Sequence, residues 1–259
     1  MADGDWSEAA AMLWQARAER RLLPQADVPM PRDLGAAYVL QDAVSAASGA
    51  RILGWKIGAG DPALQRRFAL PGPFVGPLLQ GLVHGDGAML APMPGAGLEC
   101  EISLRLGCDL AAGGTIGDAE LTAAIAAAIP SLEVIGRRFD GEMEGQGHRL
   151  VADGGINVEA VLGPDTAWDF AAGWPPVAAT LRVDGRETAS GTAASAGLMP
   201  PATLLRWLLA QPPLAARGLR TGDLVMTGTL TGVFPLAPGI RVEADFGTLG
   251  SVRASAAAA

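Results

Sequence analysis

The stretch Gly97–Gly107 places Glu99 and Glu101 inside an alternating apolar pattern. Every second residue from Leu98 to Leu106 is apolar, which is the period of a β-strand with one buried face. On a strand the two glutamates point the same way, whereas on a helix they would point roughly 200° apart. Because like charges on one face repel each other, the two carboxylates either face water or share a cation.

The 259-residue chain is acidic, with a formal net charge of −8 and a pI near 4.8. Nucleic acids and anionic membrane surfaces require a basic footprint, so we expect neither as a partner. The chain lacks a continuous apolar run of about 18 residues, so we expect no membrane span. It also lacks the pattern of a signal peptide, so we expect none. A disulfide between Cys100 and Cys108 would distort the strand, which favours reduced thiols and a cytoplasmic protein.

Lysine occurs once, at Lys56, although the chain has 19 basic residues. The Arg- and Ala-rich composition indicates that the base composition of the gene disfavours lysine codons. A lysine that is retained therefore marks a position that arginine cannot serve, or else it is retained by chance. Lysine is a compact charge whose pKa can move, whereas arginine is a rigid fork that stays charged. Lys56 lies near the end of a predicted strand, beside Gly58, and is a candidate catalytic residue.

Helical periodicity predicts a first helix over 6–21 and a second over 32–48 that ends at Gly49. The residues expected to face inward on the second helix are Leu34, Tyr38, Val39 and Val44. Further helices are predicted over 62–70, from Thr115 or Asp118 through Ile129, and over 201–210. The pattern divides the chain into an N-terminal helical segment, 1–50, and a catalytic β-rich domain, 51–259.

Strands are predicted wherever short apolar runs lie between turn residues. Their ranges are 51–57, 97–107, 131–136, 158–162, 177–183, 186–190, 224–228, 239–246 and 251–255, with short broken strands over 78–90. Asp184-Gly185 predicts a type I′ hairpin. A Pro/Gly loop is predicted over 71–77, and the polar, Gly-rich residues 137–149 are typical of a mobile surface loop that closes over a site.

Glu133 is a lone acid between Leu132 and Val134 on a predicted strand. A buried carboxylate costs several kcal/mol unless it finds a cation or hydrogen-bond donors. An ion pair with Arg137 or Arg138 would satisfy it. Alternatively, it joins Glu99 and Glu101 as the third carboxylate of a Mg²⁺ or Mn²⁺ site, which needs about six oxygens and leaves positions for substrate and water.

Other chemistries find little support in the sequence. His84 and His148 are isolated from each other and from the cysteines, so a zinc site is not expected. No Gly-x-Ser-x-Gly elbow occurs, which argues against a serine nucleophile. The glycines around Lys56 lack the spacing of a phosphate-binding loop.

Several motifs together resemble those of the fumarylacetoacetate hydrolase superfamily, and within it the branch of 2-oxopent-4-enoate hydratases and 4-oxalocrotonate decarboxylases. They are Gly54-Trp55-Lys56-Ile57-Gly58, Leu98-Glu99-Cys100-Glu101-Ile102, Leu132-Glu133-Val134-Ile135-Gly136-Arg137-Arg138, Val151-Ala152-Asp153 and Leu219-Arg220-Thr221-Gly222-Asp223 with Thr227-Gly228. The resemblance implies an α+β fold, a mixed β-roll with an N-terminal helical segment, in a homo-oligomer.

The same resemblance implies roles for individual residues. Glu99, Glu101 and Glu133 become ligands of Mg²⁺ (or Mn²⁺), and Lys56 becomes an active-site residue. Substrate contacts are expected at Leu78, Leu79, Asp153 and Thr229.

The implied function is a lyase that hydrates 2-hydroxy-2,4-dienoate or 2-oxo-4-enoate acids through a metal-stabilised enolate. Three alternatives are a decarboxylase of a 4-oxalocrotonate-like 2-oxo acid, an acylpyruvate C–C hydrolase, and a non-catalytic descendant that binds a 2-oxo acid. In each case the partner is a small carboxylic acid.

The chain departs from the pattern of this branch at three places. Gly154-Gly155-Ile156-Asn157 follows Asp153 where relatives continue with Asn and small hydroxyl residues. Gln80-Gly81 lacks the acid of the hydratases, and Gly197-Leu198-Met199-Pro200 stands in place of Gly-His-Pro. His84 and His148 are therefore candidate replacements for the missing acid and base, or else polar surface residues.

Overall fold

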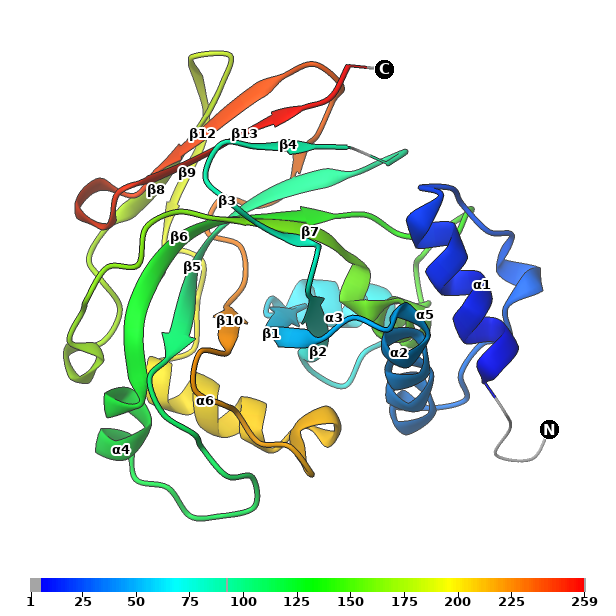
Figure 1. Ribbon diagram of the computed structural model, residues 1–259, viewed down its shortest axis with the longest axis horizontal. Coiled ribbons are helices and arrows are strands. Elements are labelled where there is room, and N and C mark those ends of the chain that lie inside the picture. The colour runs from blue at the N-terminus through cyan, green and yellow to red at the C-terminus, as the bar shows by residue number, and fades with distance from the viewer. Residues whose placement is uncertain (1–5, 92, 259) are drawn as a thin grey trace.

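The computed structural model describes residues 6–91 and 93–258, and the strands of these residues form two sheets (Figure 1). The larger sheet contains β1 (Ile52–Gly58), β2 (Phe74–Leu79), β3 (Val83–Gly85), β5 (Gly97–Leu106), β6 (Ile125–Ile135), β7 (Asn157–Leu162), β10 (Leu224–Met226) and β11 (Phe234–Pro235). The smaller sheet contains β4 (Ala88–Leu90), β8 (Ala178–Val183), β9 (Arg186–Thr192), β12 (Arg241–Asp245) and β13 (Ser251–Ala256).

Both sheets mix parallel and antiparallel pairs, and the larger sheet curls on itself. Its order is β2-β1-β10-β5-β6-β7-β3, with β11 on β5, and the smaller sheet has the order β4-β13-β12-β8-β9. Although β2 and β7 are not paired, they contact each other, so the curled sheet encloses an interior. The predicted α+β fold with a mixed β-roll is confirmed.

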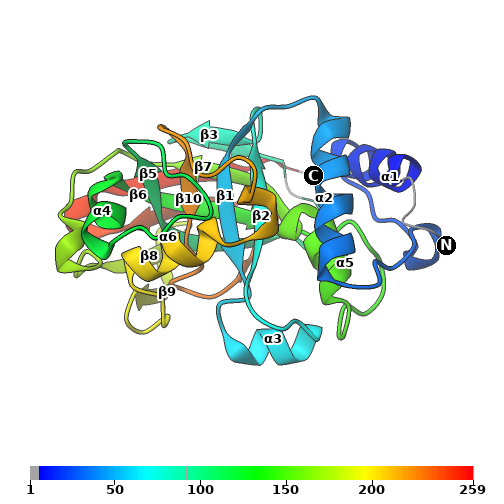
Figure 2. The same ribbon diagram turned by 90° about the horizontal axis from the view of Figure 1, so that it is seen from below.

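The helices gather at two places around the sheets (Figures 1 and 2). α1 (Ser7–Ala18) packs on α2 (Leu34–Ser48), and α2 packs on α5 (Gly147–Ala152), beside β1 and β2. α4 (Asp118–Ala123) packs on α6 (Pro201–Leu209), while α3 (Pro62–Phe68) lies apart. Within 6–91 and 93–258 no helix has the length and apolar character to cross a membrane. The domain boundary predicted at residue 50 falls between α2 and β1 and stays a prediction.

The second helix ends as the sequence predicts, but it begins at Leu34 rather than Arg32, and one inward residue is wrong. The Asp33 carboxylate accepts a hydrogen bond from the Ala36 N–H (2.8 Å), and Gly49 ends the helix with a φ of 65°. Val39 is 57% exposed. Since residues 37, 40, 41 and 44 form the buried stripe at helical spacing, position 39 falls on the opposite side.

The helix predicted through Ile129 is also wrong, because α4 ends at Ala123 and β6 begins at Ile125. The Ala-rich run favours a helix locally, but its pairing with β5 along ten register positions overrides that preference. β6 also continues through Pro130, which has no N–H. Ile102 lies opposite Pro130 on β5. Its carbonyl accepts a hydrogen bond from the Thr227 hydroxyl (2.7 Å), in place of the N–H that proline lacks.

Two segments predicted as loops are more ordered than expected. Phe74–Pro77 is the first part of β2, antiparallel to β1, because Phe74 and Val75 are buried in the core. In the segment 137–149, Arg138 and Phe139 are each 1% exposed, and Phe139 bridges to Leu23. Only part of this segment is therefore a surface loop.

The hairpin of β8 and β9 confirms the prediction made from Asp184-Gly185. Both residues have positive φ angles, 47° and 80°, as a type I′ turn requires. Asp184 also accepts a hydrogen bond from the Arg241 N–H (3.1 Å), which joins the turn to β12.

Candidate metal centre

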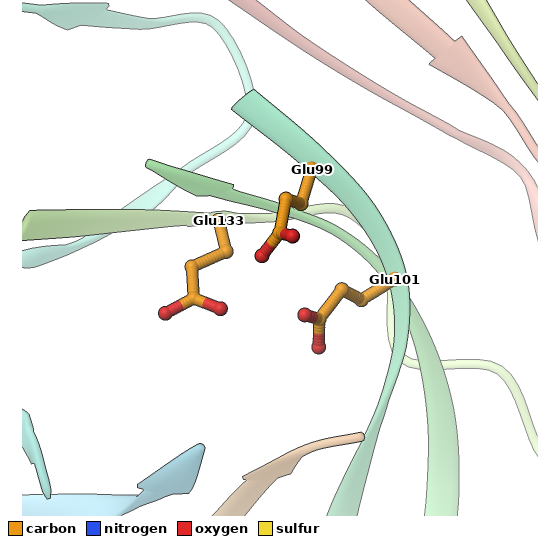
Figure 3. Close-up of side chains that lie close together, drawn as sticks. All are labelled: Glu99, Glu101 and Glu133. Atoms are coloured by element: carbon orange, nitrogen blue, oxygen red, sulfur yellow. The ribbon is translucent and has the colours of Figure 1, made fainter. Parts of the chain in front are cut away.

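Three carboxylates converge inside the curled sheet (Figure 3). β5 carries Glu99 and Glu101 on one face, and the antiparallel register of β6 sets Glu133 opposite Glu99. One oxygen of each lies within 4.8 Å of the others. Glu101 is 1% exposed and Glu133 is fully buried. The interpretation of Glu-x-Glu as a wet strand face is therefore wrong.

Burial and mutual repulsion make Glu99 and Glu101 hard to ionise. Burial, followed by the charge of Glu133, raises the pKa of Glu99 to about 7. Burial and the charges of Glu133 and Glu99 raise the pKa of Glu101 well above its usual value. Lys56 opposes both shifts. Without a further cation, the cluster is an unfavourable arrangement of charge.

Lys56 contacts the cluster from β1, as the sequence predicts. Its Nζ lies 3.4 Å from Glu133 Oε1 and 5.5 Å from the centre of the Phe74 ring. Its side chain is almost fully buried. The alternative partners of Glu133 are wrong, because Arg138 pairs with Asp153 and Arg137 makes no ion pair with Glu133 in the described part of the chain.

Each fully buried glutamate has one oxygen engaged and one without a partner. Glu101 Oε2 accepts a hydrogen bond from the Gly228 N–H (3.0 Å), and Glu133 Oε1 accepts one from Asn157 Nδ2 (2.9 Å). Glu101 Oε1 and Glu133 Oε2 are buried without a hydrogen-bond partner. Buried carboxylate oxygens require a cation or a donor, and an all-oxygen set suits a hard divalent ion. The three glutamates therefore fit such an ion.

Apolar and hydroxyl side chains line the interior beyond the carboxylates. The Ser103 and Ser131 hydroxyls are 2.6 Å apart, and the Ser131 hydroxyl also donates to the Glu101 carbonyl (3.0 Å). A small apolar cluster from β2, β6, β7 and β10 follows: Leu78, Ile129, Ala160, Leu224 and Met226. Leu78 thus lies in the interior, whereas alternation along β2 turns Leu79 to the other face.

Asp153 and Thr229, the other predicted substrate contacts, are engaged elsewhere. The Arg138 backbone N–H donates to Asp153 Oδ2 (2.9 Å), and Arg138 Nε donates to Oδ1. Burial raises the pKa of Asp153, although Arg138 opposes that shift. The Thr229 hydroxyl donates to the Gly232 carbonyl (3.0 Å) in the loop that also carries Gly228. Thr229 is partly exposed next to the site, whereas Asp153 belongs to a separate ion pair.

The structure does not bring His84 to the carboxylates. His84 Nε2 lies 3.6 Å from Glu159 Oε1, which also accepts a hydrogen bond from Arg20 Nη2 (3.3 Å). Glu159 is the register partner of Val134, whose side chain points to the opposite face from Glu133. His84 therefore belongs to an ion-pair cluster on the other face of the sheet.

His148 is also directed away from the site. Its Nδ1 lies 3.1 Å from the carbonyl oxygen of Pro31, in the segment between α1 and α2. Neither imidazole is a contact of Glu99, Glu101 or Glu133 among residues 6–91 and 93–258. The prediction of His84 and His148 as the acid and base of this site loses its geometric basis.

Sequence reasoning missed two contacts of the cluster, Asn157 and the Gly228 N–H. A backbone donor leaves no signal in side-chain chemistry. Asn157 did leave one, because it is the single asparagine of the chain, as Lys56 is the single lysine. Both of these rare residues contact Glu133.

Comparison with known proteins agrees with the fold. The family described as Fumarylacetoacetate (FAA) hydrolase C-terminal matches residues 80–256, more than half of the chain. A 2-keto-4-pentenoate hydratase of Burkholderia vietnamiensis (strain G4 / LMG 22486) is 31% identical over 262 residues, which cover 98% of each chain. The TodF product hydratase of Pseudomonas putida F1 is 30% identical over 260 residues, covering 97% of this chain and 95% of the relative.

A solved structure has the same fold over almost the whole chain. It is the 4-oxalocrotonate decarboxylase from Pseudomonas putida G7, complexed with magnesium and adipate, with a TM-score of 0.85. The two sequences are 23% identical, and the match covers 97% of each chain.

Proposed function

The chain belongs to the fumarylacetoacetate hydrolase family, and from that premise we propose that it is a divalent-metal-dependent hydratase of small 2-oxo-4-enoate or 2-hydroxy-2,4-dienoate acids. The observation that carries this proposal is the triad of Glu99, Glu101 and Glu133, in which the two fully buried members, Glu101 and Glu133, each keep one oxygen without a partner. The full-length relatives named as hydratases support the reaction class.

We propose Glu99, Glu101 and Glu133 as the ligands of the ion, with Mg²⁺ first and Mn²⁺ as a substitute. The magnesium in the decarboxylase structure supports this choice. When bound, a divalent ion supplies a Lewis acid that polarises the 2-oxo group and offsets the negative charge that develops as the substrate enolises.

Lys56 supplies the remaining positive charge at the site. Three carboxylates and a divalent ion leave about one negative charge, which Lys56 Nζ offsets as the substrate carboxylate arrives. With both histidines directed elsewhere, Lys56 Nζ is the group to which we assign proton transfer. The apolar cluster around Leu78 keeps water from the hydrocarbon part of the substrate.

Decarboxylation of a 4-oxalocrotonate-like acid is the second candidate function. It is favoured by two observations: neither histidine contacts the triad, and position 80 carries a glutamine instead of an acid. A reaction that begins with loss of CO₂ needs fewer proton-transfer groups than hydration does. Acylpyruvate hydrolysis requires an activated water, and neither imidazole is placed to activate it.

Three finer expectations also stay predictions: magnesium as the physiological ion, a homo-oligomer, and a cytoplasmic location. Metal analysis of protein purified without added ions tests whether magnesium is the physiological ion. Mass measurement of the purified protein by light scattering tests whether it is a homo-oligomer.

The deciding experiment is a turnover assay with Mg²⁺ or Mn²⁺, in which 2-hydroxypenta-2,4-dienoate and 4-oxalocrotonate are compared and the products are identified by NMR. Hydration of the first acid supports the proposal, and CO₂ release from the second supports the alternative. Turnover of neither acid favours a non-catalytic descendant. The double variant Glu99→Gln/Glu101→Gln serves as the control, and intact metal binding and turnover in it would contradict the metal site.

A further inference from the structure

Two residue types that occur once in the chain meet at one carboxylate oxygen. Asn157 Nδ2 donates to Glu133 Oε1 (2.9 Å), and Lys56 Nζ lies 3.4 Å from the same oxygen. The chain contains one asparagine and one lysine. Asn157 is 1% exposed, so its amide makes this contact without competition from bulk water.

The other oxygen of Glu133, Oε2, is buried without a partner. We propose that Asn157 is a positioning residue for Glu133: with Lys56 it holds Oε1, so that Oε2 alone is presented to the ion. This inference rests on the metal site of the proposed function. It extends that site to a residue that never touches the ion, because hydrogen bonds from such residues fix the orientation of ligands.

A bulge in the sheet directs Asn157 toward Glu133. Val134 pairs with Glu159 and Ile135 pairs with Asn157, so the register shifts between the two pairs. Glu159 lies on the face opposite Glu133, and regular alternation would place residue 157 on that same face. The irregularity instead brings the Asn157 amide to the carboxylates, which is a common effect of bulges near functional sites.

The turn before Asn157 also touches Lys56. Gly154, Gly155 and Ile156 have φ angles of 63°, 67° and 58°, and a positive φ is unfavourable for the β-branched Ile156. A Cβ at position 155 would lie 3.3 Å from Lys56 Cδ, and one at position 76 would lie 2.2 Å from the Gly154 carbonyl oxygen. This strained turn therefore helps to position the Lys56 and Asn157 side chains, which both contact Glu133 Oε1.

Holding one oxygen limits how Glu133 binds an ion. A glutamate with two free oxygens can occupy two coordination positions, whereas one with a single free oxygen occupies one. Glu101 is limited in the same way, because the Gly228 N–H engages its Oε2. A divalent ion held through one oxygen of each of these two glutamates would keep more coordination positions for the substrate.

The test measures Mn²⁺ binding to the full-length protein by calorimetry, without substrate, for wild type and Asn157→Leu. We expect about 10- to 100-fold weaker binding in the variant, the usual cost of losing a partner that orients a ligand. The matched control is Gln41→Met. It removes another fully buried amide, which donates to the carbonyls of Val75 (2.9 Å) and Val151 (2.7 Å) and not to a carboxylate.

Thermal unfolding of the metal-free proteins is measured in parallel. A purely structural role predicts that both variants lose stability and that both keep wild-type Mn²⁺ affinity. Affinity of Asn157→Leu within twofold of wild type would overturn the proposal. If that variant does not fold, Asn157→Ser, whose hydroxyl is too short to replace the amide, is judged by the same criterion.

The outcome for the metal site itself is read from wild type. If wild type binds no Mn²⁺, or if Glu99→Gln/Glu101→Gln binds it as wild type does, the proposed function fails together with this inference. If wild type binds Mn²⁺ through the triad and Asn157→Leu binds it equally well, only the positioning role fails.

Discussion

Asp153 and the glutamate triad are both buried carboxylate sites, but only one of them is complete. Both oxygens of Asp153 accept hydrogen bonds from Arg138, and the charge of the nearby Arg17 also favours this carboxylate. In the triad, three carboxylates share one lysine, and Glu101 and Glu133 each keep an oxygen without a partner. The difference separates a structural ion pair from a site that is prepared for a ligand.

The largest expected effect breaks the complete pair. Arg138→Met removes the cation that donates to both oxygens of the buried Asp153, so we expect the free energy of unfolding to fall by about 3–5 kcal/mol. Urea denaturation measures this loss. The control is Arg206→Met, since Arg206 pairs with Asp118 on the surface and its removal leaves stability nearly unchanged. Equal effects of the two variants would contradict the structural role of Asp153.

Breaking the incomplete site gives the opposite pattern. Glu101→Gln removes a ligand, so we expect Mn²⁺ affinity to fall about 100-fold or more, beyond the usual cost of losing an orienting partner. Because burial already raises the pKa of Glu101, a neutral side chain there does not lower the stability of the metal-free protein. Calorimetry and thermal unfolding measure the two effects. Glu120→Gln, on the exposed end of α4, is the matched control.

The pH dependence of metal binding sharpens the comparison. The pKa of Glu99 is raised to about 7 from its usual 4.5, so between these values the metal-free folded state holds a proton that the unfolded state has lost. Stability from this group is therefore present below pH 4.5 and is lost as pH rises toward 7. An ion replaces that proton, so we expect the rise in Tm produced by Mn²⁺ to be larger at pH 8 than at pH 5.5.

Calorimetry in two buffers of different ionisation enthalpy checks the same linkage directly. Near pH 6, Mn²⁺ binding should release protons, and near pH 8 it should release fewer. Proton release that does not change over this range would mean that Glu99 is not protonated in the metal-free protein.

The smallest effect is expected at the two histidines, which are both directed away from the site. His84→Gln and His148→Gln should each leave turnover within about twofold of wild type, because surface-type substitutions away from a site have small effects. Steady-state kinetics at saturating metal measures this. A loss of about 100-fold, the lower end of what a general acid or base usually contributes, would make the histidines candidate acids and bases again.

The local part of the site could be predicted from the sequence. Alternation along β5 predicted the shared face of Glu99 and Glu101, and the scarcity of lysine singled out Lys56. Glu133 stood out as a lone acid on an apolar strand, and the resemblance to a family then implied that it is a ligand. These signals are short-range or compositional, so they do not depend on how distant strands pair.

The rest depends on long-range pairing. The faces of His84 and Asn157 are set by the register of β3 and β6 on β7 and by one bulge, and a shift of one residue reverses a face. The Ala-rich start of β6 has the composition of a helix, and it forms a strand because it pairs with β5. The pattern of residues along the sequence alone does not show which residues of distant strands lie opposite each other.

Gly76 on β2 lies close to the turn before Asn157. This close contact limits which mutations the protein tolerates at position 76. Any side chain there meets the Gly154 carbonyl oxygen at 2.2 Å, and backbone cannot swing aside as a flexible side chain does. Even an alanine would push the turn off the sheet and disturb Lys56 and Asn157 together. In a library of random variants, position 76 should therefore appear as intolerant as the ligands, although it carries no chemical group.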